Sequence, residues 1–346
     1  MKAIVVHKKK DVRLDERTDP QPSRGEVLAK VHMGGVCGSD IHYYNQGRIM
    51  SYELKEPLVI GHEVSGEVVG VGPGVTAVKA GQQIGIHPAR PCLTCDYCKS
   101  NRRNLCPDTL FFGSAMRFPH IQGAFSQLLL LRDDQCYPTQ NRISWQILTL
   151  AEPLAVGLHG VDRTGGVNGK RVLICGAGPI GQTAMLAAKY RGAGMVAITD
   201  IEAQPLKIAQ KLGADVTVNV RKEANTIQKW QENRGYFDVV LEATGNDQSV
   251  ETAVHCAKPG GVIVQLGMSS NPVDPIPRNA VITKELDFRG AFRFDQEFGE
   301  VVAALDEARI DPTPLVTQVF AMDQAEAALK AAPDRSKQLK VQISMD

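Results

Sequence analysis

Four cysteines lie close together in the chain, at the spacing Cys-x2-Cys-x2-Cys-x7-Cys. Four thiolates this near one another can surround one zinc ion in a tetrahedron and leave no position open, which is typical of a structural site. An iron–sulfur cluster and a pair of disulfides are the alternatives, but the bacterial ferredoxin pattern has three residues before its last cysteine, where this chain has seven. The spacing favours a structural zinc bound by Cys92, Cys95, Cys98 and Cys106.

Other residues that can bind a metal are spread more widely along the chain. They are Cys37, the neighbouring pair His62 and Glu63, and Glu152. Glu152 is the only acid in the run LTLAEPLAVGLHG, residues 148–160, and a carboxylate buried there without a partner would be costly. A catalytic zinc needs about three protein ligands and one position for water or substrate. These residues can supply that set, although a lone histidine is often structural and a lone cysteine often packs as a small apolar side chain.

A glycine-rich turn, GAGPIG at residues 176–181, follows the apolar run RVLIC and precedes a helical pattern. Between a strand and a helix, such glycines let the backbone approach a pyrophosphate at the helix N-terminus, whereas without that context they form only a tight turn. Asp200 ends the next predicted strand, where a carboxylate accepts hydrogen bonds from the adenosine ribose and repels a 2′-phosphate. We therefore expect NAD as the cofactor in preference to NADP. The candidate cofactor-binding residues are Gly176, Gly178, Pro179, Ile180, Gly181 and Asp200, with Leu266 and Gly267 at the end of the later strand pattern GGVIVQLG.

The segments that must position these residues differ in their sequence patterns along the chain. Residues 1–138 contain short β-like runs separated by glycine and proline turns, which indicates an irregular, mostly β domain. Residues 171–290 alternate strand and helix patterns, which predicts an α/β fold with a doubly wound parallel sheet. The tail, 291–346, contains two helical patterns and ends in the strand-like KVQISM, which we expect to return to the first domain. We place the domain bounds at 1–147, 148–290 and 291–346.

The bulk properties are those of a globular protein long enough for two domains. The chain has 346 residues, 43% of them hydrophobic, and its 39 basic and 38 acidic residues leave a net charge of +1. The chain thus lacks the excess of basic residues that is typical of proteins that bind nucleic acid or an anionic membrane. The first residues, MKAIVVHKKK, do not fit a signal peptide, and no apolar run approaches the roughly 20 residues of a spanning helix. We expect a soluble cytoplasmic protein that binds neither nucleic acid nor a membrane.

Taken together, GHEVSGEVVGVG (61–72), the four-cysteine cluster and GAGPIG resemble the zinc-dependent medium-chain dehydrogenases, over essentially the whole chain. CGSDIHYY (37–44), AEPLAVGLH (151–159) and AFRF (291–294) are similar to the polyol, or sorbitol, dehydrogenase branch. LFFGSAMRFPHIQGAF (110–125) is similar to the corresponding stretch of L-idonate 5-dehydrogenases. The resemblance implies a GroES-like catalytic first domain, a Rossmann domain inserted before the C-terminal segment, two zinc ions per chain, and a homodimer or homotetramer.

The resemblance also implies which residues bind the catalytic zinc. Cys37 and His62 match its first two ligands, and Glu152 stands where the polyol branch has glutamate and the alcohol dehydrogenase branch has cysteine. Glu63 matches an acid that can exchange with water at the metal. Asp40 matches a carboxylate that orients the metal-binding histidine.

Further roles follow from the same resemblance. Ser39 matches the hydroxyl that takes the substrate proton, and His42 the next member of that proton relay. Tyr43 and Arg293 match substrate-pocket positions of the polyol branch. Phe294 departs from the tyrosine expected beside that arginine, which removes one hydroxyl contact.

The expected reaction is reversible hydride transfer between NAD(P) and a secondary alcohol of a small molecule. A sugar acid such as L-idonate, which would give 5-keto-gluconate, carries a carboxylate that is bound best by the fork of an arginine. Arg293, Arg117 and His120 are the candidate partners. A neutral polyol such as sorbitol or xylitol is the alternative substrate, and a non-catalytic NAD-binding zinc protein is the alternative from another class.

Overall fold

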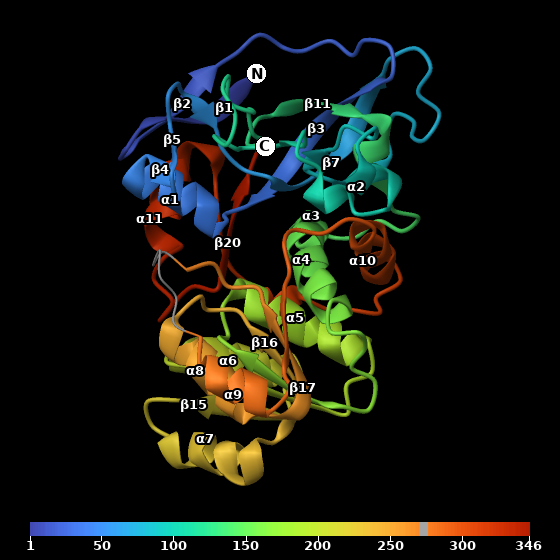
Figure 1. Cartoon of the computed structure of the whole chain (residues 1–346). Coiled ribbons are helices and arrows are strands. Elements are labelled where there is room, and N and C mark those ends of the chain that lie inside the picture. Colours follow the sequence, from blue (N-terminus) through green and yellow to red (C-terminus); the bar gives the residue numbers. More distant parts are fainter. Residues whose placement is uncertain (270–275) are drawn as a thin grey trace.

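The computed structural model describes residues 1–269 and 276–346. The lower half of the molecule in Figure 1 contains a six-stranded sheet in which neighbouring strands are parallel, and the glycine-rich turn follows an interior strand of this sheet. Counted in chain order, the strands of this sheet run 3-2-1-4-5-6, which is the arrangement of dinucleotide-binding folds. The predicted Rossmann sheet is therefore confirmed. In spatial order the strands are β15 (Val216–Asn219), β14 (Met195–Asp200), β13 (Arg171–Cys175), β16 (Phe237–Glu242), β17 (Ala257–Gln265) and β18 (Asp287–Gly290).

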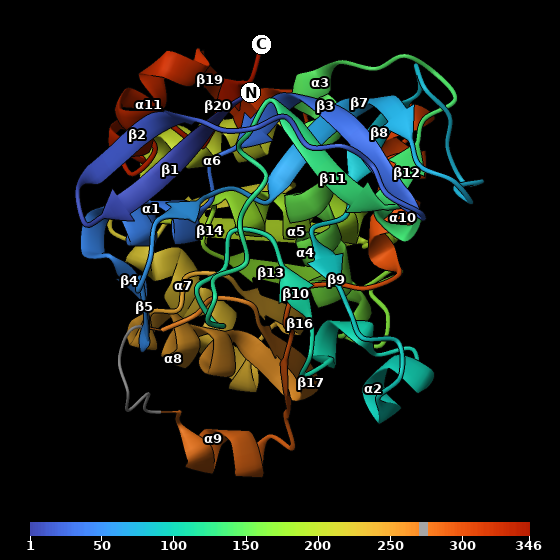
Figure 2. The same ribbon diagram turned by 90° about the horizontal axis from the view of Figure 1, so that it is seen from above.

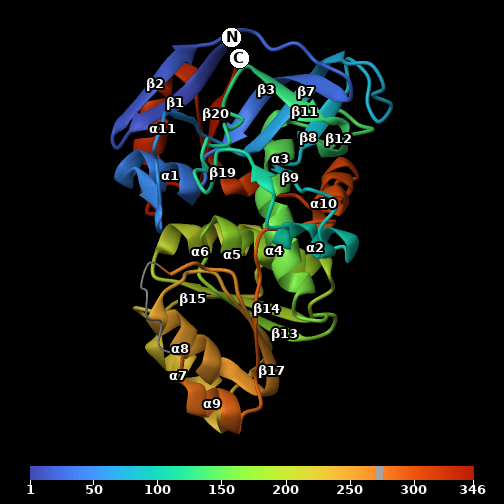
Figure 3. The same ribbon diagram turned by 45° about the horizontal axis from the view of Figure 1, so that its top comes forward.

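Helices cover both faces of this sheet. They are α4 (Ala151–Asp162), α5 (Pro179–Tyr190), α6 (Ala203–Lys211), α7 (Ala224–Gln231), α8 (Asp247–Cys256) and the short α9 (Arg278–Thr283). Because successive side chains of a strand point to opposite faces, Val172 and Ile174 of β13 are buried in one cluster, and Leu173 and Cys175 in another. The first cluster packs against α4, α5 and α6, which Figure 3 shows on the side of the sheet nearer the first domain. The second packs against α7 and α8.

A mostly antiparallel sheet forms the first domain. Its strands are β12 (Cys136–Pro138), β8 (Gln83–Ile86), β7 (Glu63–Val71), β3 (Glu26–Gly35), β20 (Lys340–Ser344) and β19 (Val316–Phe320), and β11 (Leu128–Arg132) also pairs with β3. β20 is the predicted KVQISM strand, and it pairs antiparallel with β3, with Gln342 opposite Gly35. The C-terminal strand β20 therefore lies inside this sheet, between β3 from the first part of the chain and β19.

The C-terminal segment contributes two helices, α10 (Glu297–Asp306) and α11 (Ala325–Ala331). α10 packs on α4, where Phe298 and Val301 share a buried cluster with Leu154. α11 lies beside β19 and β20 in the first domain (Figure 2). The segment that we expected to return to the first domain therefore contacts both domains.

Shorter elements carry several of the residues that could do chemistry. The remaining strands are β1 (Lys2–Lys8), β2 (Asp11–Glu16), β4 (Arg48–Ile49), β5 (Tyr52–Glu53), β6 (Leu58–Val59), β9 (Ala89–Arg90) and β10 (Leu110–Phe111). The remaining helices are α1 (Gly38–Gln46), α2 (Asp96–Lys99) and α3 (Trp145–Thr149), with the 3-10 turns η1 (Arg103–Leu105), η2 (Asp133–Gln135), η3 (Glu232–Arg234), η4 (Thr313–Leu315) and η5 (Met322–Gln324). Within 1–269 and 276–346, no helix is both long and apolar enough to cross a bilayer.

Candidate metal centres and active site

The four cysteines of the predicted structural site come together in the fold. Their sulfur atoms all lie within 4.8 Å of one another, and the Sγ atoms of Cys92 and Cys98 are 4.0 Å apart. All eight cysteines of the chain are free of disulfides. Since Zn–S bonds of about 2.3 Å in a tetrahedron place the sulfurs about 3.8 Å from one another, the cluster fits a zinc ion.

Hydrogen bonds to these sulfurs also suit a metal site. The backbone N–H groups of Thr94 and Cys95 donate to Cys92 Sγ at 3.5 and 3.4 Å, and that of Cys92 donates to Cys106 Sγ at 3.4 Å. Hydrogen bonds from Thr94 lower the pKa of Cys92 to about 6, whereas burial raises the pKa of Cys98 to about 12. Four thiolates this close repel one another, so a bound cation is needed to hold them all in the charged form.

A second group of metal-binding residues forms where α1 and β7 begin. Cys37 directly precedes α1, His62 directly precedes β7, and Glu63 is the first residue of that strand. One ligand atom from each of the three lies within 4.8 Å of the other two. His62 and Glu63 are buried, and burial raises the pKa of Cys37 to about 11. The fold thus brings together residues that the sequence places 25 and 26 positions apart, from Cys37 to His62 and Glu63.

Asp40 joins the two loops that carry these ligands. Its Oδ2 accepts a hydrogen bond from the Cys37 N–H and its Oδ1 accepts one from the Gly61 N–H, both at 2.9 Å. The carboxyl is fully buried, and burial raises its pKa while the charge of the nearby His62 lowers it. The hydrogen bonds of Asp40 therefore fix the backbone beside both ligands.

Glu63 has a partner that the sequence reasoning missed. Lys340, the first residue of β20, donates from Nζ to both carboxylate oxygens of Glu63 at 2.8 Å and to the carbonyl of Val36 at 3.2 Å. The side chain of Lys340 is 4% exposed and that of Glu63 is 1% exposed. Burial by itself lowers the pKa of Lys340, but the charges of Glu63 and Cys37 raise it above its usual value. Lys340 is the one charged residue of the buried run KVQIS, which is the only signal that pointed to it.

Glu152 lies in the first turn of α4 and is buried beside this group. Burial raises the pKa of its carboxyl to about 8, while the charge of His62 lowers it and those of Glu63 and Cys37 raise it. The 4.8 Å group does not include its oxygens, and among the described residues its carboxylate has no hydrogen bond or ion pair. A buried acid without a partner is costly, and beside a thiol and an imidazole it fits a further ligand of a zinc ion.

Helix α1 leads from this group toward solvent. The hydroxyl oxygen of Ser39 is buried and has no hydrogen-bond partner. His42 follows three positions later, on the same side of the helix, and is exposed. Tyr43 is buried, and its hydroxyl oxygen accepts a hydrogen bond from the Ala115 N–H at 2.8 Å. An orphaned buried hydroxyl with an exposed imidazole one turn away has the arrangement of a short proton path.

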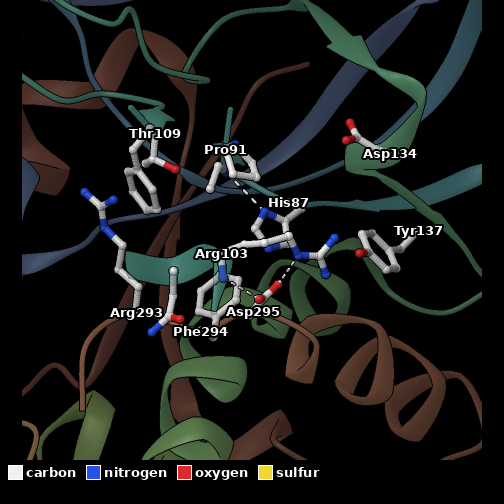
Figure 4. A pocket seen from close by; sticks show the side chains of 12 residues that line it. His87, Pro91, Arg103, Thr109, Asp134, Tyr137, Arg293, Phe294 and Asp295 are labelled. Carbon is white, nitrogen blue, oxygen red and sulfur yellow. Dashed lines mark hydrogen bonds and ion pairs between the residues drawn. The ribbon is translucent and has the colours of Figure 1, made fainter. Parts of the chain in front are cut away.

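Arg293 lines a pocket beside this region (Figure 4). Its guanidinium lies over the rings of Phe111 and Phe292, at 4.2 and 4.8 Å from their centres. Among the described residues it forms no ion pair, and burial lowers its pKa to about 10, whereas the charges of Glu152 and Tyr43 raise it. Its Nη2 donates to Met116 Sδ at 3.6 Å, so within the described residues the guanidinium has a sulfur acceptor but no carboxylate at ion-pair distance.

The residues on either side of Arg293 are held by the segment that carries the four cysteines, residues 92–106. Arg103 donates from its backbone N–H and from Nε to the carboxylate of Asp295 at 2.8 and 2.6 Å, and Figure 4 shows this pair in the same pocket. Asn104 Nδ2 donates to the carbonyl of Phe292 at 2.9 Å. Arg293 has a positive φ of 56°, a conformation that a residue with a side chain adopts only when its surroundings impose it.

Two other predicted substrate residues already have partners. Arg117 donates from Nη2 to the carbonyl of Pro107 at 2.8 Å and to Asp108 Oδ1 at 2.9 Å. His120 is buried; its Nε2 accepts from the Lys55 N–H at 2.8 Å and its Nδ1 donates to the carbonyl of Arg117 at 2.7 Å. Neither side chain lines the pocket of Arg293, and Phe294, which does, stacks on Phe298. Of these three predicted residues, only Arg293 lines the pocket.

The predicted cofactor-binding residues gather at the carboxyl edge of the parallel sheet. Gly178 directly precedes α5 and Pro179 is its first residue. A side chain on Gly181 would place its Cβ 1.7 Å from the carbonyl oxygen of Gly176, so only glycine fits there. Gly267 follows β17 at the same edge, whereas the side chain of Leu266 packs toward α4.

Asp200, the last residue of β14, has a partner that the sequence did not indicate. It is 7% exposed, and its Oδ2 accepts hydrogen bonds from the Ala177 N–H and from Arg335 Nη2, both at 2.7 Å. Arg335 belongs to the turn that leads into β20.

Comparison with known proteins agrees with both halves of this structure. Residues 23–141 match the family model of the alcohol dehydrogenase GroES-like domain, and residues 179–307 match that of zinc-binding dehydrogenases. The chain is 37% identical over 341 residues to the L-idonate 5-dehydrogenase (NAD(P)(+)) of Escherichia coli K12, covering 99% of this chain and 98% of that protein. It is 35% identical over 347 residues to the sorbitol dehydrogenase of Gallus gallus, covering 99% of this chain and 96% of that protein.

The fold is also that of a solved structure. The crystal structure of L-idonate 5-dehydrogenase from Escherichia coli K-12 matches with a TM-score of 0.95 at 37% identity, covering 99% of this chain and 97% of that chain. Family models and full-length relatives therefore confirm the GroES-like and Rossmann architecture and the expected zinc and nicotinamide cofactors. The chain belongs to the zinc-dependent medium-chain dehydrogenases and is an oxidoreductase of their alcohol and polyol dehydrogenase group.

Proposed function

We propose that this enzyme oxidises a secondary alcohol of a sugar acid, with L-idonate as the best candidate, reversibly and with NAD(P). The main support for a sugar acid is the guanidinium of Arg293, which feels the charge of Glu152 but forms no ion pair among the described residues. A substrate carboxylate supplies that partner and can accept both N–H groups of the arginine fork. The L-idonate 5-dehydrogenase of Escherichia coli, 37% identical over the whole chain, supports the same substrate class.

The donor set fits a catalytic zinc. Cys37, His62 and Glu152 would hold the ion, while Lys340 holds the carboxylate of Glu63. A zinc ion bound there supplies Lewis-acid polarisation of an alcohol oxygen, and the nicotinamide supplies the hydride acceptor. Glu152 in place of a thiolate would make the ligand environment harder, which suits oxygen-rich substrates.

The residues of this chain provide the proton path and the binding of the substrate. The free hydroxyl of Ser39 takes the proton of the substrate alcohol, and the exposed His42 passes it to solvent. Arg293 binds the substrate carboxylate and so fixes which hydroxyl reaches the metal. Tyr43 of α1 is a further candidate substrate residue, and the Ala115 N–H holds its hydroxyl in place.

A substrate panel tests this function. L-Idonate, L-galactonate, sorbitol and xylitol are offered to the zinc-loaded enzyme with NAD, before and after chelation. We expect the two aldonates to be oxidised with the higher kcat/KM, and turnover to be lost with the metal. Arg293→Ala should raise KM for the aldonates about 10- to 100-fold, the value of a hydrogen-bonded charge pair, and change KM for the neutral polyols less than about threefold.

Arg117→Ala is the matched control, because Arg117 is paired with Asp108 outside the pocket. It should leave all four KM values near those of the unmodified enzyme. Equal losses on aldonates and polyols in the Arg293 variant would contradict the carboxylate assignment. A higher kcat/KM for sorbitol than for L-idonate would make the enzyme a neutral polyol dehydrogenase.

Proton release on metal binding tests the ligand set. Burial raises the pKa of Glu152 to about 8 and that of Cys37 to about 11, so both groups carry protons at pH 7 in the metal-free protein. Because a ligand must lose its proton to bind zinc, affinity at this site should fall as the pH is lowered. Calorimetric titration with zinc in two buffers of different ionisation enthalpy measures the number of protons released.

At pH 7 the Glu152→Gln variant should release about one proton fewer than the unmodified protein, since its amide has no proton to lose. Above pH 9 the difference should vanish, because Glu152 is then ionised before the metal arrives. Equal proton release by the two proteins at pH 7 would show that Glu152 does not bind the metal.

A further inference from the structure

An ion pair joins the two domains at the predicted cofactor site. Arg335, in the turn between α11 and β20, donates from Nη2 to Oδ2 of Asp200 at 2.7 Å. The side chain of Asp200 is 5% exposed, while that of Arg335 is 42% exposed. The carboxylate is therefore fixed at the end of β14, whereas the arginine reaches it from the C-terminal segment and has room to move.

The same guanidinium lies over the phosphate-binding turn. A Cβ built on Gly178 would be 3.0 Å from Arg335 Nη1. Gly178 directly precedes α5, and a glycine at this point of the turn lets a dinucleotide approach the backbone closely. A nucleotide entering this site thus meets Arg335 next to Asp200.

The ion pair with Arg335 changes how Asp200 affects the choice between NAD(H) and NADP(H). A carboxylate at the end of this strand accepts hydrogen bonds from the adenosine ribose, and alone it repels a 2′-phosphate. Here a cation within hydrogen-bond distance balances the charge of that carboxylate. An arginine beside the ribose is the group that accommodates a 2′-phosphate, because its fork matches the phosphate oxygens.

We propose that Arg335 binds the 2′-phosphate of NADP(H), so that this chain accepts both NADP(H) and NAD(H). With NAD(H), Asp200 accepts the ribose hydroxyls and Arg335 stays beside it. With NADP(H), Arg335 keeps Nη2 on the carboxylate of Asp200 and donates from Nη1, which lies over Gly178, to the phosphate, so the carboxylate stays balanced. The inference rests on the nicotinamide part of the proposed function and does not depend on which alcohol is oxidised.

The test measures binding without any alcohol substrate. Dissociation constants of NADH and NADPH are obtained from nucleotide fluorescence on the full-length, zinc-loaded protein. Arg335→Ala should weaken NADPH about 10- to 100-fold, the range for a charge-assisted contact, and change NADH less than about threefold. Asp200→Asn should have the opposite effect, weakening NADH and sparing NADPH.

Two control variants remove other cations. Lys337→Ala removes a charge two positions away that pairs with Asp334, and should leave both dissociation constants unchanged. Arg221→Ala removes the cation that lies 4.0 Å from Glu202, just beyond Asp200, and should also spare NADPH. Loss of NADPH binding in the Arg221 variant but not in the Arg335 variant would overturn the proposal. Arg335→Gln, which keeps most of the side chain, repeats the test if the alanine variant melts at a lower temperature.

Two small probes separate the 2′-phosphate from the pyrophosphate. Adenosine 2′,5′-bisphosphate and adenosine 5′-monophosphate differ only in the 2′-phosphate, and neither carries a pyrophosphate. Arg335→Ala should weaken only the bisphosphate. Equal weakening of both probes, or of NADH and NADPH, would assign Arg335 to another part of the cofactor and overturn the proposal. If the unmodified protein binds NADH but not NADPH, this inference fails alone; if it binds neither, the proposed function fails with it.

Discussion

The Glu152→Ala variant should lose about 10³-fold or more in kcat, because a Lewis acid contributes several kcal/mol to the transition state and each tenfold is about 1.4 kcal/mol. The physical reason lies in the metal-free geometry: a carboxylate is buried beside Cys37 and His62 with no partner among the described residues. Removing it takes away a ligand, so elemental analysis should find one zinc per chain instead of two. Steady-state kinetics and the zinc content are the measurements.

The loss should be confined to the catalytic metal. The dissociation constant of NADH should stay within about threefold of the unmodified value, because Glu152 belongs to α4 and is not among the residues of the turn at 176–181. The four-cysteine site should keep its zinc, because Glu152 is not one of its four ligands. Near-normal turnover in this variant would show that Glu152 is not needed for the reaction. If Glu63→Gln instead loses the metal and Glu152→Ala retains it, the ligand is Glu63.

The Lys340→Met variant should lower the free energy of unfolding by about 3–5 kcal/mol, the range for removing one partner of a buried ion pair. Both oxygens of Glu63 depend on Lys340 Nζ at 2.8 Å, and both side chains are almost fully buried. Methionine has a similar length but no charge, so the carboxylate of Glu63 would remain buried and unpaired. Denaturant unfolding of the zinc-loaded protein measures the change.

Two comparisons identify the cause of this destabilisation. The double variant Lys340→Met, Glu63→Gln should recover most of the lost stability, because it removes both charges together. Lys330→Met breaks an exposed pair with Glu326 and should change stability by no more than about 0.5 kcal/mol. If Lys340→Met is no more destabilising than Lys330→Met, the pair does not hold β20 against β7.

The sequence by itself predicted the local sites of this protein. The four cysteines, 92–106, and the glycine turn, 176–181, are short patterns whose chemistry depends on close spacing. Their geometry follows almost entirely from a few neighbouring residues, so the four cysteines come together and the βα turn forms in the fold as expected. The alternation of strands and helices likewise predicted the parallel sheet, because a strand pattern of period two and a helix pattern of 3.6 are local properties.

Only the tertiary structure decided which charge meets which. Lys340 and Glu63 are 277 positions apart, Arg103 and Asp295 are 192 apart, and Arg335 and Asp200 are 135 apart. No pattern in the chain links such partners, because they meet only when the last strand enters the first sheet and the domains close on each other. The same packing gave His120 and Arg117 polar partners of their own and left Arg293, within the part of the chain that the structure describes, without an ion pair. A residue type shows what a side chain can do, but burial and the nearest opposite charge determine whether it is free to do it.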